Sequence, residues 1–212
     1  MKNNTIKYLV LTTITIILFA LYYTYKIKND GYQDAIIFEK KINEKDNTIK
    51  DRETFYQNII LATKRNENLK LAENLRLINI DGDTLLAKDV SFKNKIVLRY
   101  SILNCSDCVD EEFNILEKNK SLFSDNLIIM TYHENLRSFI MDWKKLQKMG
   151  INNVNLYLLV DNNIGIPLEK ENIPYYFYLG NDLSMTNFFI PLREYPHLSN
   201  NYLKHTFQNF FN

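Results

Sequence analysis

The sequence contains only two cysteines, and they lie three positions apart, at Cys105 and Cys108. Two cysteines placed at random in a chain of this length would show that spacing about one time in a hundred, so the pair indicates a shared role. Thiols separated by two residues are close enough to form a disulfide or to resolve a mixed one. These residue types therefore suit reversible dithiol–disulfide exchange.

The segments around the two cysteines place them where a strand meets a helix. Ile96–Tyr100 is apolar enough for a buried strand, and a helical pattern begins near Val109. A helix N-terminus carries unpaired N–H groups and partial positive charge, which stabilise a thiolate and lower the pKa of the first cysteine. We therefore expect Cys105 to attack a disulfide and Cys108 to resolve the product.

Two other roles for the cysteines are a structural disulfide and a metal site. The spacing also fits a structural disulfide. A metal ion needs more ligands than two thiols supply, and His133, His197 and His205 form no cluster with them along the chain. We expect no metal ion and no bound cofactor.

The segment from Arg76 to Asn212 has the pattern of one compact α/β domain. The expected strands are 77–80, 84–86, 96–100, 126–132, 156–160, 175–179 and 185–190. The expected helices are 109–120, 136–149 and 198–211. Strands that alternate with helices predict a central mixed sheet, largely parallel, that is flanked by helices and ends in an antiparallel hairpin.

Four features of this domain resemble the thioredoxin superfamily, in particular its membrane-anchored TlpA/ResA-like and redoxin branch. They are the turn at Asp81-Gly82 followed by Asn94-Lys95, the Cys105–Cys108 pair, Ile173-Pro174 before a strand, and the turn Gly180-Asn181-Asp182. The resemblance implies a thioredoxin-like fold and thiol–disulfide oxidoreductase activity. Its partners would be protein thiols and disulfides and an unknown redox partner.

The resemblance also assigns substrate binding to Ile173 and Pro174. X-Pro bonds are the peptide bonds that tolerate the cis form, and in this fold such a loop would face the cysteines. We therefore expect a cis bond at Pro174 and a pairing of the Ile173 backbone with an extended substrate strand. An ordinary trans proline that opens a strand is the alternative.

The residues around the cysteines differ from the usual pattern of the superfamily. Asn104 replaces an aromatic residue, and Ser106-Asp107 replaces the usual pair between the cysteines. The charge of Asp107 should disfavour a thiolate and so oppose the helix N-terminus. The direction of exchange, reductive or oxidative, therefore stays open.

Arg99 is a second candidate for tuning the thiol pKa. It lies six residues before Cys105, where thioredoxin carries a buried acid. An inward guanidinium would favour the thiolate. A side chain that pairs with Glu111 or Glu112, or that points outward to solvent, is the arrangement we expect.

Residues 1–29 are dominated by a stretch that fits a membrane. Tyr8–Tyr25 holds 18 residues without a charge, and as a helix it would span roughly 27 Å. A cleaved signal peptide is the alternative, but Ala20 is followed by large residues and not by a small-residue cleavage site. We expect an uncleaved single-pass anchor in the cell (inner) membrane. Flanking lysines leave its orientation open, and the resemblance implies a cytoplasmic N-terminus with the domain extracytoplasmic, in the periplasm.

Residues 30–75 form a polar segment with a helical pattern. Apolar residues recur at steps of three, four or seven, at Ala35, Phe38, Ile42, Ile49, Tyr56 and Ile59. One interpretation is a solvated helical stalk, and the other is a short coiled coil that makes the protein a dimer. The stalk is favoured because the pattern lacks a clean run of heptads.

The overall composition excludes several classes of protein. The chain has 212 residues, with 26 Lys and Arg against 25 Asp and Glu. This balance argues against a nucleic-acid-binding protein, which carries a concentrated basic excess. A hydrophobic share of 46% excludes a wholly disordered chain.

Three functions remain in competition. The leading one is a membrane-tethered thiol–disulfide oxidoreductase, and the second is a redox-inactive thioredoxin-like adaptor, since a fold does not guarantee an activity. The third is a thiol peroxidase. Its usual pattern has a Thr or Ser three residues before the reactive cysteine and a proline upstream, but Ile102 occupies that position and no proline precedes Cys105.

Overall fold

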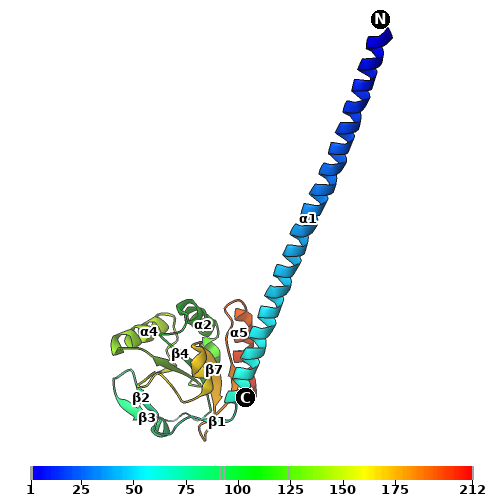
Figure 1. The fold of residues 1–212 in the computed structure, drawn as a ribbon. Helices are drawn as coiled ribbons and strands as arrows, with labels where there is room; N and C mark the ends of the chain where they lie inside the picture. The colour runs from blue at the N-terminus through cyan, green and yellow to red at the C-terminus, as the bar shows by residue number, and fades with distance from the viewer. Residues whose placement is uncertain (1, 91, 93, 124, 212) are drawn as a thin grey trace. The chain divides into compact units, whose positions relative to one another are not determined.

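A computed structural model describes the backbone of residues 2–90, 92, 94–123 and 125–211, and the side chains of these residues outside 2–17 and 27–38. The chain divides into two compact units, one that ends at Gln57 and one that begins at Asn58. A single continuous helix, α1 (Lys2–Asn66), makes up the first unit and extends into the second (Figure 1).

The side chains of residues 39–58 of α1 are all exposed. They include Ile42 and Ile49 of the predicted stripe. Among the residues whose side chains are described, no helix carries a stretch long and apolar enough to cross a membrane, and most of the predicted anchor Tyr8–Tyr25 lies outside those residues. The anchor and the stalk therefore stay predictions.

The last turns of α1 belong to the second unit. Ile59 and Ala62 pack against its core, and the buried Asn66 accepts a hydrogen bond from the backbone N–H of Leu168 at 3.2 Å. The compact unit thus includes chain that precedes Arg76, the predicted start of the domain.

One mixed sheet of eight strands forms the centre of the second unit, in the order β1-β8-β7-β4-β5-β6-β2-β3. The strands are β1 (Leu69–Lys70), β2 (Arg76–Ile78), β3 (Thr84–Leu86), β4 (Lys95–Ser101), β5 (Leu127–Tyr132), β6 (Asn155–Leu159), β7 (Tyr175–Leu179) and β8 (Ser184–Phe189). Only β4, β5 and β6 pair in parallel among these strands, and the other neighbours are antiparallel.

The prediction of a mixed sheet is confirmed. The prediction that most of its strands are parallel is wrong, because most neighbouring strands pair antiparallel. A buried central strand is apolar on both faces whichever way it runs, so the apolar run of β7 gave no sign of its direction. The pairing of β7 with β4 is antiparallel and joins Tyr175 to Arg99.

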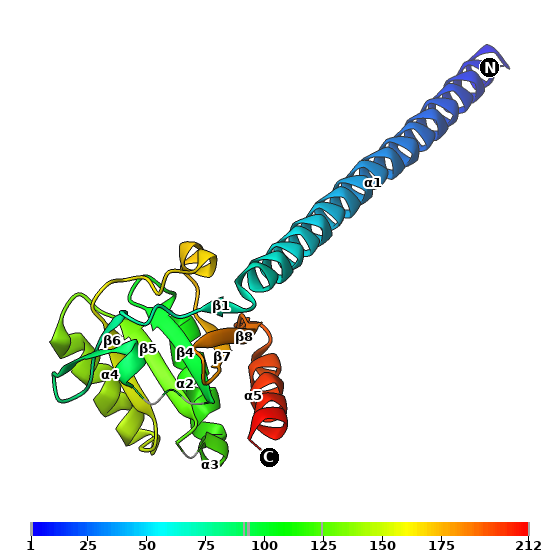
Figure 2. The ribbon, with the colours of Figure 1, turned by 90° about the horizontal axis from the view of Figure 1, so that it is seen from below.

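Helical segments lie on both faces of the sheet, but the three predicted α-helices all pack on the same face. The helical segments are α2 (Ser106–Lys118), α3 (Lys120–Phe123), α4 (Leu136–Lys148), α5 (Pro196–Phe210) and the 3-10 turns η1 (Ala87–Asp89) and η2 (Pro167–Glu171). Phe113 of α2, Phe139 of α4 and Phe207 of α5 share the core on one face. Leu168 of η2 and the end of α1 cover the other face. Figure 2 shows α4 toward the β6 side of the sheet and α5 toward the β7–β8 side.

Candidate functional site

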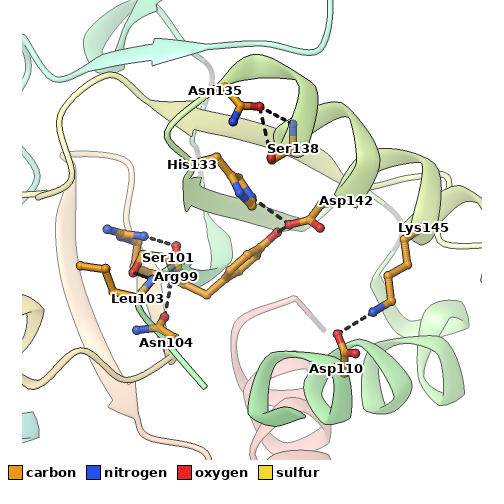
Figure 3. A network of polar contacts seen from close by, with 11 residues as sticks. Arg99, Ser101, Leu103, Asn104, Asp110, His133, Asn135, Ser138, Asp142 and Lys145 are labelled. Carbon is orange, nitrogen blue, oxygen red and sulfur yellow. Dashed lines mark hydrogen bonds and ion pairs between the residues drawn. The ribbon is translucent and has the colours of Figure 1, made fainter. Parts of the chain in front are cut away.

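A short turn joins the end of β4 to the first cysteine. Ser101 donates its backbone N–H to Asn104 Oδ1 at 2.7 Å, and Leu103 donates its N–H to the Ser101 hydroxyl at 3.2 Å (Figure 3). These bonds close the turn, so the next residue, Cys105, becomes the N-cap of α2. Asn104 thus has a structural role in which its amide fixes the position of the cysteine.

The two cysteines lie at the start of α2, with Cys105 as its N-cap and Cys108 in its first turn, and neither is joined in a disulfide. Cys105 is exposed, and its Sγ accepts a hydrogen bond from the backbone N–H of Cys108 at 3.3 Å. Hydrogen bonds from the thiol and the backbone of Cys108 lower the pKa of Cys105, and the positive charge of Arg193 acts in the same direction. Asp107 opposes this shift, as the sequence predicted.

Cys108 has the opposite character. Burial, hydrogen bonding to Cys105 and the charge of Cys105 raise the pKa of the Cys108 thiol to about 11. Cys108 is also less accessible than Cys105. The pair therefore holds one accessible thiol that ionises readily and one shielded thiol that keeps its proton, which is the arrangement that an attacking and a resolving cysteine require.

Arg193 is a site residue that sequence reasoning missed. It lies in the segment between β8 and α5, and its guanidinium contacts the Asp107 carboxylate at 3.2 Å. Both side chains are exposed. No local pattern indicated this pair, because 86 positions separate the two residues along the chain.

The expected surface position of Arg99 is wrong. Its side chain is only 2% exposed, and its Nε and Nη2 atoms donate to the two Glu169 oxygens at 2.9 Å each. Tyr175 donates its hydroxyl to the same carboxylate at 2.5 Å. An unpaired guanidinium has a lower free energy when it is exposed to solvent. Here η2 brings a carboxylate to Arg99, and a buried charge is tolerated when it is paired. The proposal that Arg99 tunes the thiol pKa stays a prediction.

The structure brings Ile173 to the cysteine loop but not through a cis bond. Continuing the β4–β7 register from Arg99 and Tyr175 places Ile173 beside Ser101, and Ile173 lines a small pocket together with Ser101 and Asn104. No cis peptide bond occurs among the described residues, so the predicted cis form of Pro174 is wrong. The trans form of an X-Pro bond is favoured by about 0.5–1 kcal/mol. Pro174 directly precedes β7, where its lack of a backbone N–H removes no hydrogen bond from the strand.

A second polar network lies behind the loop, between β4, the end of β5 and α4. Tyr100 donates its hydroxyl to Asp142 at 2.6 Å, and His133 Nε2 contacts the same carboxylate oxygen at 2.9 Å (Figure 3). Burial and the charge of Asp142 raise the pKa of Tyr100 well above its usual range. These contacts fix α4 against the strands that carry the cysteine loop. Sequence reasoning missed the network, because its members come from separate elements.

Glu112 of α2 is a buried carboxyl group near the cysteines along the chain. It accepts hydrogen bonds from the hydroxyls of Tyr176 and Ser199 at 2.9 Å each. Burial raises the pKa of Glu112 from 4.5 to about 7. Sequence reasoning named Glu112 as a possible partner of Arg99, which pairs with Glu169 instead. The helical spacing of Glu112 with the buried Val109 and Leu116 was the signal that could have placed it inward.

The raised pKa of Glu112 makes folding stability pH dependent. Between pH 4.5 and about 7 the folded state keeps a proton that the unfolded state has released, so stability falls as the pH rises through this window. We expect the wild type to lose on the order of 3 kcal/mol relative to Glu112→Gln between these limits. Urea unfolding of both proteins at several pH values measures this, and parallel pH profiles would contradict it.

The part of the chain that the structure describes holds no group of three metal-ligating side chains. No family model and no curated protein sequence matches the chain. Similar solved structures include an uncharacterized thioredoxin-like protein from Porphyromonas gingivalis, with 13% identity, a TM-score of 0.47, and coverage of 69% of this chain and 97% of that one.

Two further similar structures are described as redox proteins. A secreted disulfide oxidoreductase from Mycobacterium tuberculosis is 8% identical over 62% of this chain and 96% of its own, with a TM-score of 0.43. A thiol:disulfide interchange protein from Chlorobium tepidum TLS is 14% identical over 65% and 96%, with a TM-score of 0.40.

The chain's own topology identifies its fold. Parallel strands β4, β5 and β6 are extended by the antiparallel β7–β8 hairpin, α2, α4 and α5 pack against the sheet, and the Cys105–Cys108 pair begins the helix that follows β4. This arrangement is that of a thioredoxin-like fold.

Proposed function

We propose that this protein is a membrane-tethered, extracytoplasmic thiol–disulfide oxidoreductase that exchanges the Cys105–Cys108 dithiol with disulfides of other proteins. The observation that carries the proposal is the asymmetry of the two thiols. Cys105 is exposed and has a lowered pKa, whereas Cys108 is shielded and has a raised one. A disulfide with a purely structural role needs no such difference.

The exchange proceeds in two displacements. The Cys105 thiolate attacks one sulfur of a substrate disulfide, a mixed disulfide forms, and the other substrate sulfur leaves as a thiolate that takes up a proton. Cys108 then loses its proton and attacks Cys105 Sγ, which forms the Cys105–Cys108 disulfide and releases the second substrate thiol. Two electrons pass to the substrate. The same steps in reverse oxidise a substrate dithiol.

Ile173 and Pro174 support the binding of a substrate segment. Ile173 lies beside Ser101 and lines the small pocket at the cysteine loop. Ile173 lies two residues before the start of β7, a position that suits pairing between its backbone and an extended segment of the substrate. The partners in this proposal are proteins with accessible thiols or disulfides, and a redox partner that restores the pair.

The location of the domain is part of the same proposal. The uncharged segment Tyr8–Tyr25 anchors the chain in the inner membrane, and residues 30–75 hold the domain away from the lipid. An exchangeable dithiol fits an oxidising compartment outside the cytoplasm. A pegylation test of single cysteines introduced near each end of the anchor, in intact cells with Cys105 and Cys108 replaced, checks this orientation.

The activity is tested with insulin as the disulfide substrate. We expect the reduced full-length protein to cleave insulin disulfides while Cys105 and Cys108 become joined, with one protein disulfide formed for each insulin disulfide lost. Mass spectrometry of the alkylated protein measures both quantities. Failure to react with insulin or with oxidised glutathione would favour the adaptor, and rapid consumption of hydroperoxide without exchange would favour the peroxidase.

A further inference from the structure

The charge that Asp107 brings between the two cysteines is countered by a residue from a distant part of the chain. Asp107 lies in the first turn of α2, and its carboxylate raises the pKa of both cysteines. Arg193 contacts that carboxylate at 3.2 Å and lowers the pKa of both. The ion pair thus joins two opposite charges that both act on the thiols.

The segment that carries Arg193 is held at both of its ends. Ile190 is buried at its start, and Pro196 begins α5, which packs against α2. Within the segment, Tyr195 donates its backbone N–H to the Leu192 carbonyl at 2.8 Å. Arg193 is therefore presented to the start of α2 by a turn of defined shape.

The other charged groups near the start of α2 have different partners. Asp110 pairs with Lys145 of α4 at 2.5 Å, and Lys145 also lies over the Phe113 ring. Glu112 is buried against Tyr176 and Ser199 and faces the core. Glu111 contributes further negative charge to this turn, as its effect on Glu112 shows. Among the side chains that the structure describes, Arg193 is the cation that lowers the pKa of both cysteines.

We propose that Arg193 is a positioning residue for the exchange reaction, which holds the Asp107 carboxylate and offsets its charge beside the Cys105 sulfur. This inference rests on the proposed oxidoreductase function and adds a component that lies outside the Cys-x-x-Cys segment. In the folded protein the offset keeps a larger fraction of Cys105 as thiolate at neutral pH. It also stabilises the reduced pair relative to the disulfide, because the disulfide carries no charge.

The test is the pH dependence of Cys105 alkylation by iodoacetamide in the full-length protein, with the labelled site identified by mass spectrometry. We expect Arg193→Gln to raise the pKa of Cys105 and to slow its alkylation about threefold at a pH below that pKa, which is the size expected for one exposed charge. Arg193→Lys should retain most of the wild-type rate. Asp107→Asn should speed the reaction, and the double variant should lie near the wild type.

Two comparisons separate an electrostatic effect from a structural one. Arg76→Gln is the matched control, because Arg76 forms a similarly exposed ion pair with Asp161 at 3.4 Å and is not among the charges that shift the pKa of Cys105 or Cys108. Raising the salt concentration to about 1 M should reduce the difference in alkylation rate between Arg193→Gln and the wild type, because the Debye length then falls to about 3 Å and exposed charges are screened. A structural role would not respond to salt in this way.

The proposal is overturned if Arg193→Gln alkylates like Arg76→Gln, or if the double variant is as slow as Arg193→Gln alone. Should Arg193→Gln fail to fold, an unchanged rate in Asp107→Asn would overturn it equally. The alkylation rate measures the reactivity of the Cys105 thiol and does not measure disulfide exchange. A protein that alkylates as expected but does not exchange disulfides would therefore contradict the oxidoreductase function and leave the charge offset established.

Discussion

The Cys108→Ser variant is expected to accumulate a mixed disulfide between Cys105 and its substrate, whereas Cys105→Ser is expected to form none. Cys105 is the exposed thiol with the lowered pKa, so it makes the first attack. Without Cys108 the mixed disulfide has no internal thiol to resolve it. Disulfide reduction by Cys105→Ser should fall to the level of a reaction without protein, because a serine hydroxyl does not replace a thiolate.

Non-reducing gel electrophoresis after acid quenching measures the trapped species. The double variant Cys105→Ser/Cys108→Ser is the control for non-covalent association with the substrate. Equal trapping by the two single variants, or trapping through Cys108 alone, would contradict the assigned order of attack. Retained insulin reduction in Cys105→Ser would remove Cys105 from the reaction altogether.

Replacing Glu169 by alanine is expected to destabilise the domain by about 3–5 kcal/mol, the range for breaking one partner of a buried ion pair. The substitution leaves the buried guanidinium of Arg99 without its carboxylate and removes the acceptor of the Tyr175 hydroxyl. The effect should be seen as a fall of roughly 10 °C in the melting temperature, given the size of the domain.

The matched control for this variant is Asp161→Ala, which breaks the exposed ion pair with Arg76. Exposed pairs contribute about 0–1 kcal/mol, so this variant should melt close to the wild type. Replacing Arg99 and Glu169 together by Met and Leu should recover much of the loss, because it removes both buried charges. Equal melting temperatures for Glu169→Ala and Asp161→Ala would show that the buried pair contributes no more than a surface pair.

Local patterns in the sequence predicted much of the second unit. The strand Tyr175–Leu179 occurs with the predicted bounds. Helix α4 was predicted over 136–149 and spans Leu136–Lys148, with Asn135 as its N-cap. Gly150 follows the end of this helix and adopts a φ of 74°, which a residue without a Cβ accommodates at low energetic cost. These elements carry their own stop signals and periodicity.

Local sequence patterns could not predict the contacts that surround the cysteines. Arg99 meets Glu169 across 70 positions of chain, and Arg193 meets Asp107 across 86. Each pair depends on strand register and on the path of a connecting segment, which neither propensity nor periodicity encodes. Because unpaired charges are rarely buried, Arg99 was expected to pair with Glu111 or Glu112 or to point outward. Nothing in the sequence indicated that η2 would bring the Glu169 carboxylate to it.

The prediction for Pro174 shows the same limit. The resemblance to the thioredoxin superfamily predicted that this segment faces the cysteines, and in the structure Ile173 lies beside Ser101 and lines a pocket with Asn104. It did not give the isomer of the peptide bond, which is trans in this structure. The position follows from the sheet topology, whereas the isomer depends on local packing that the short motif does not specify.

The reversible redox chemistry of the Cys105–Cys108 pair is tested most directly by equilibrating the full-length protein in glutathione buffers of graded potential and counting alkylated thiols. We predict a single two-electron transition between dithiol and disulfide, with a midpoint between about −270 and −120 mV, the span of known exchange proteins. A pair that stays fully reduced or fully oxidised at every potential would contradict the proposed function.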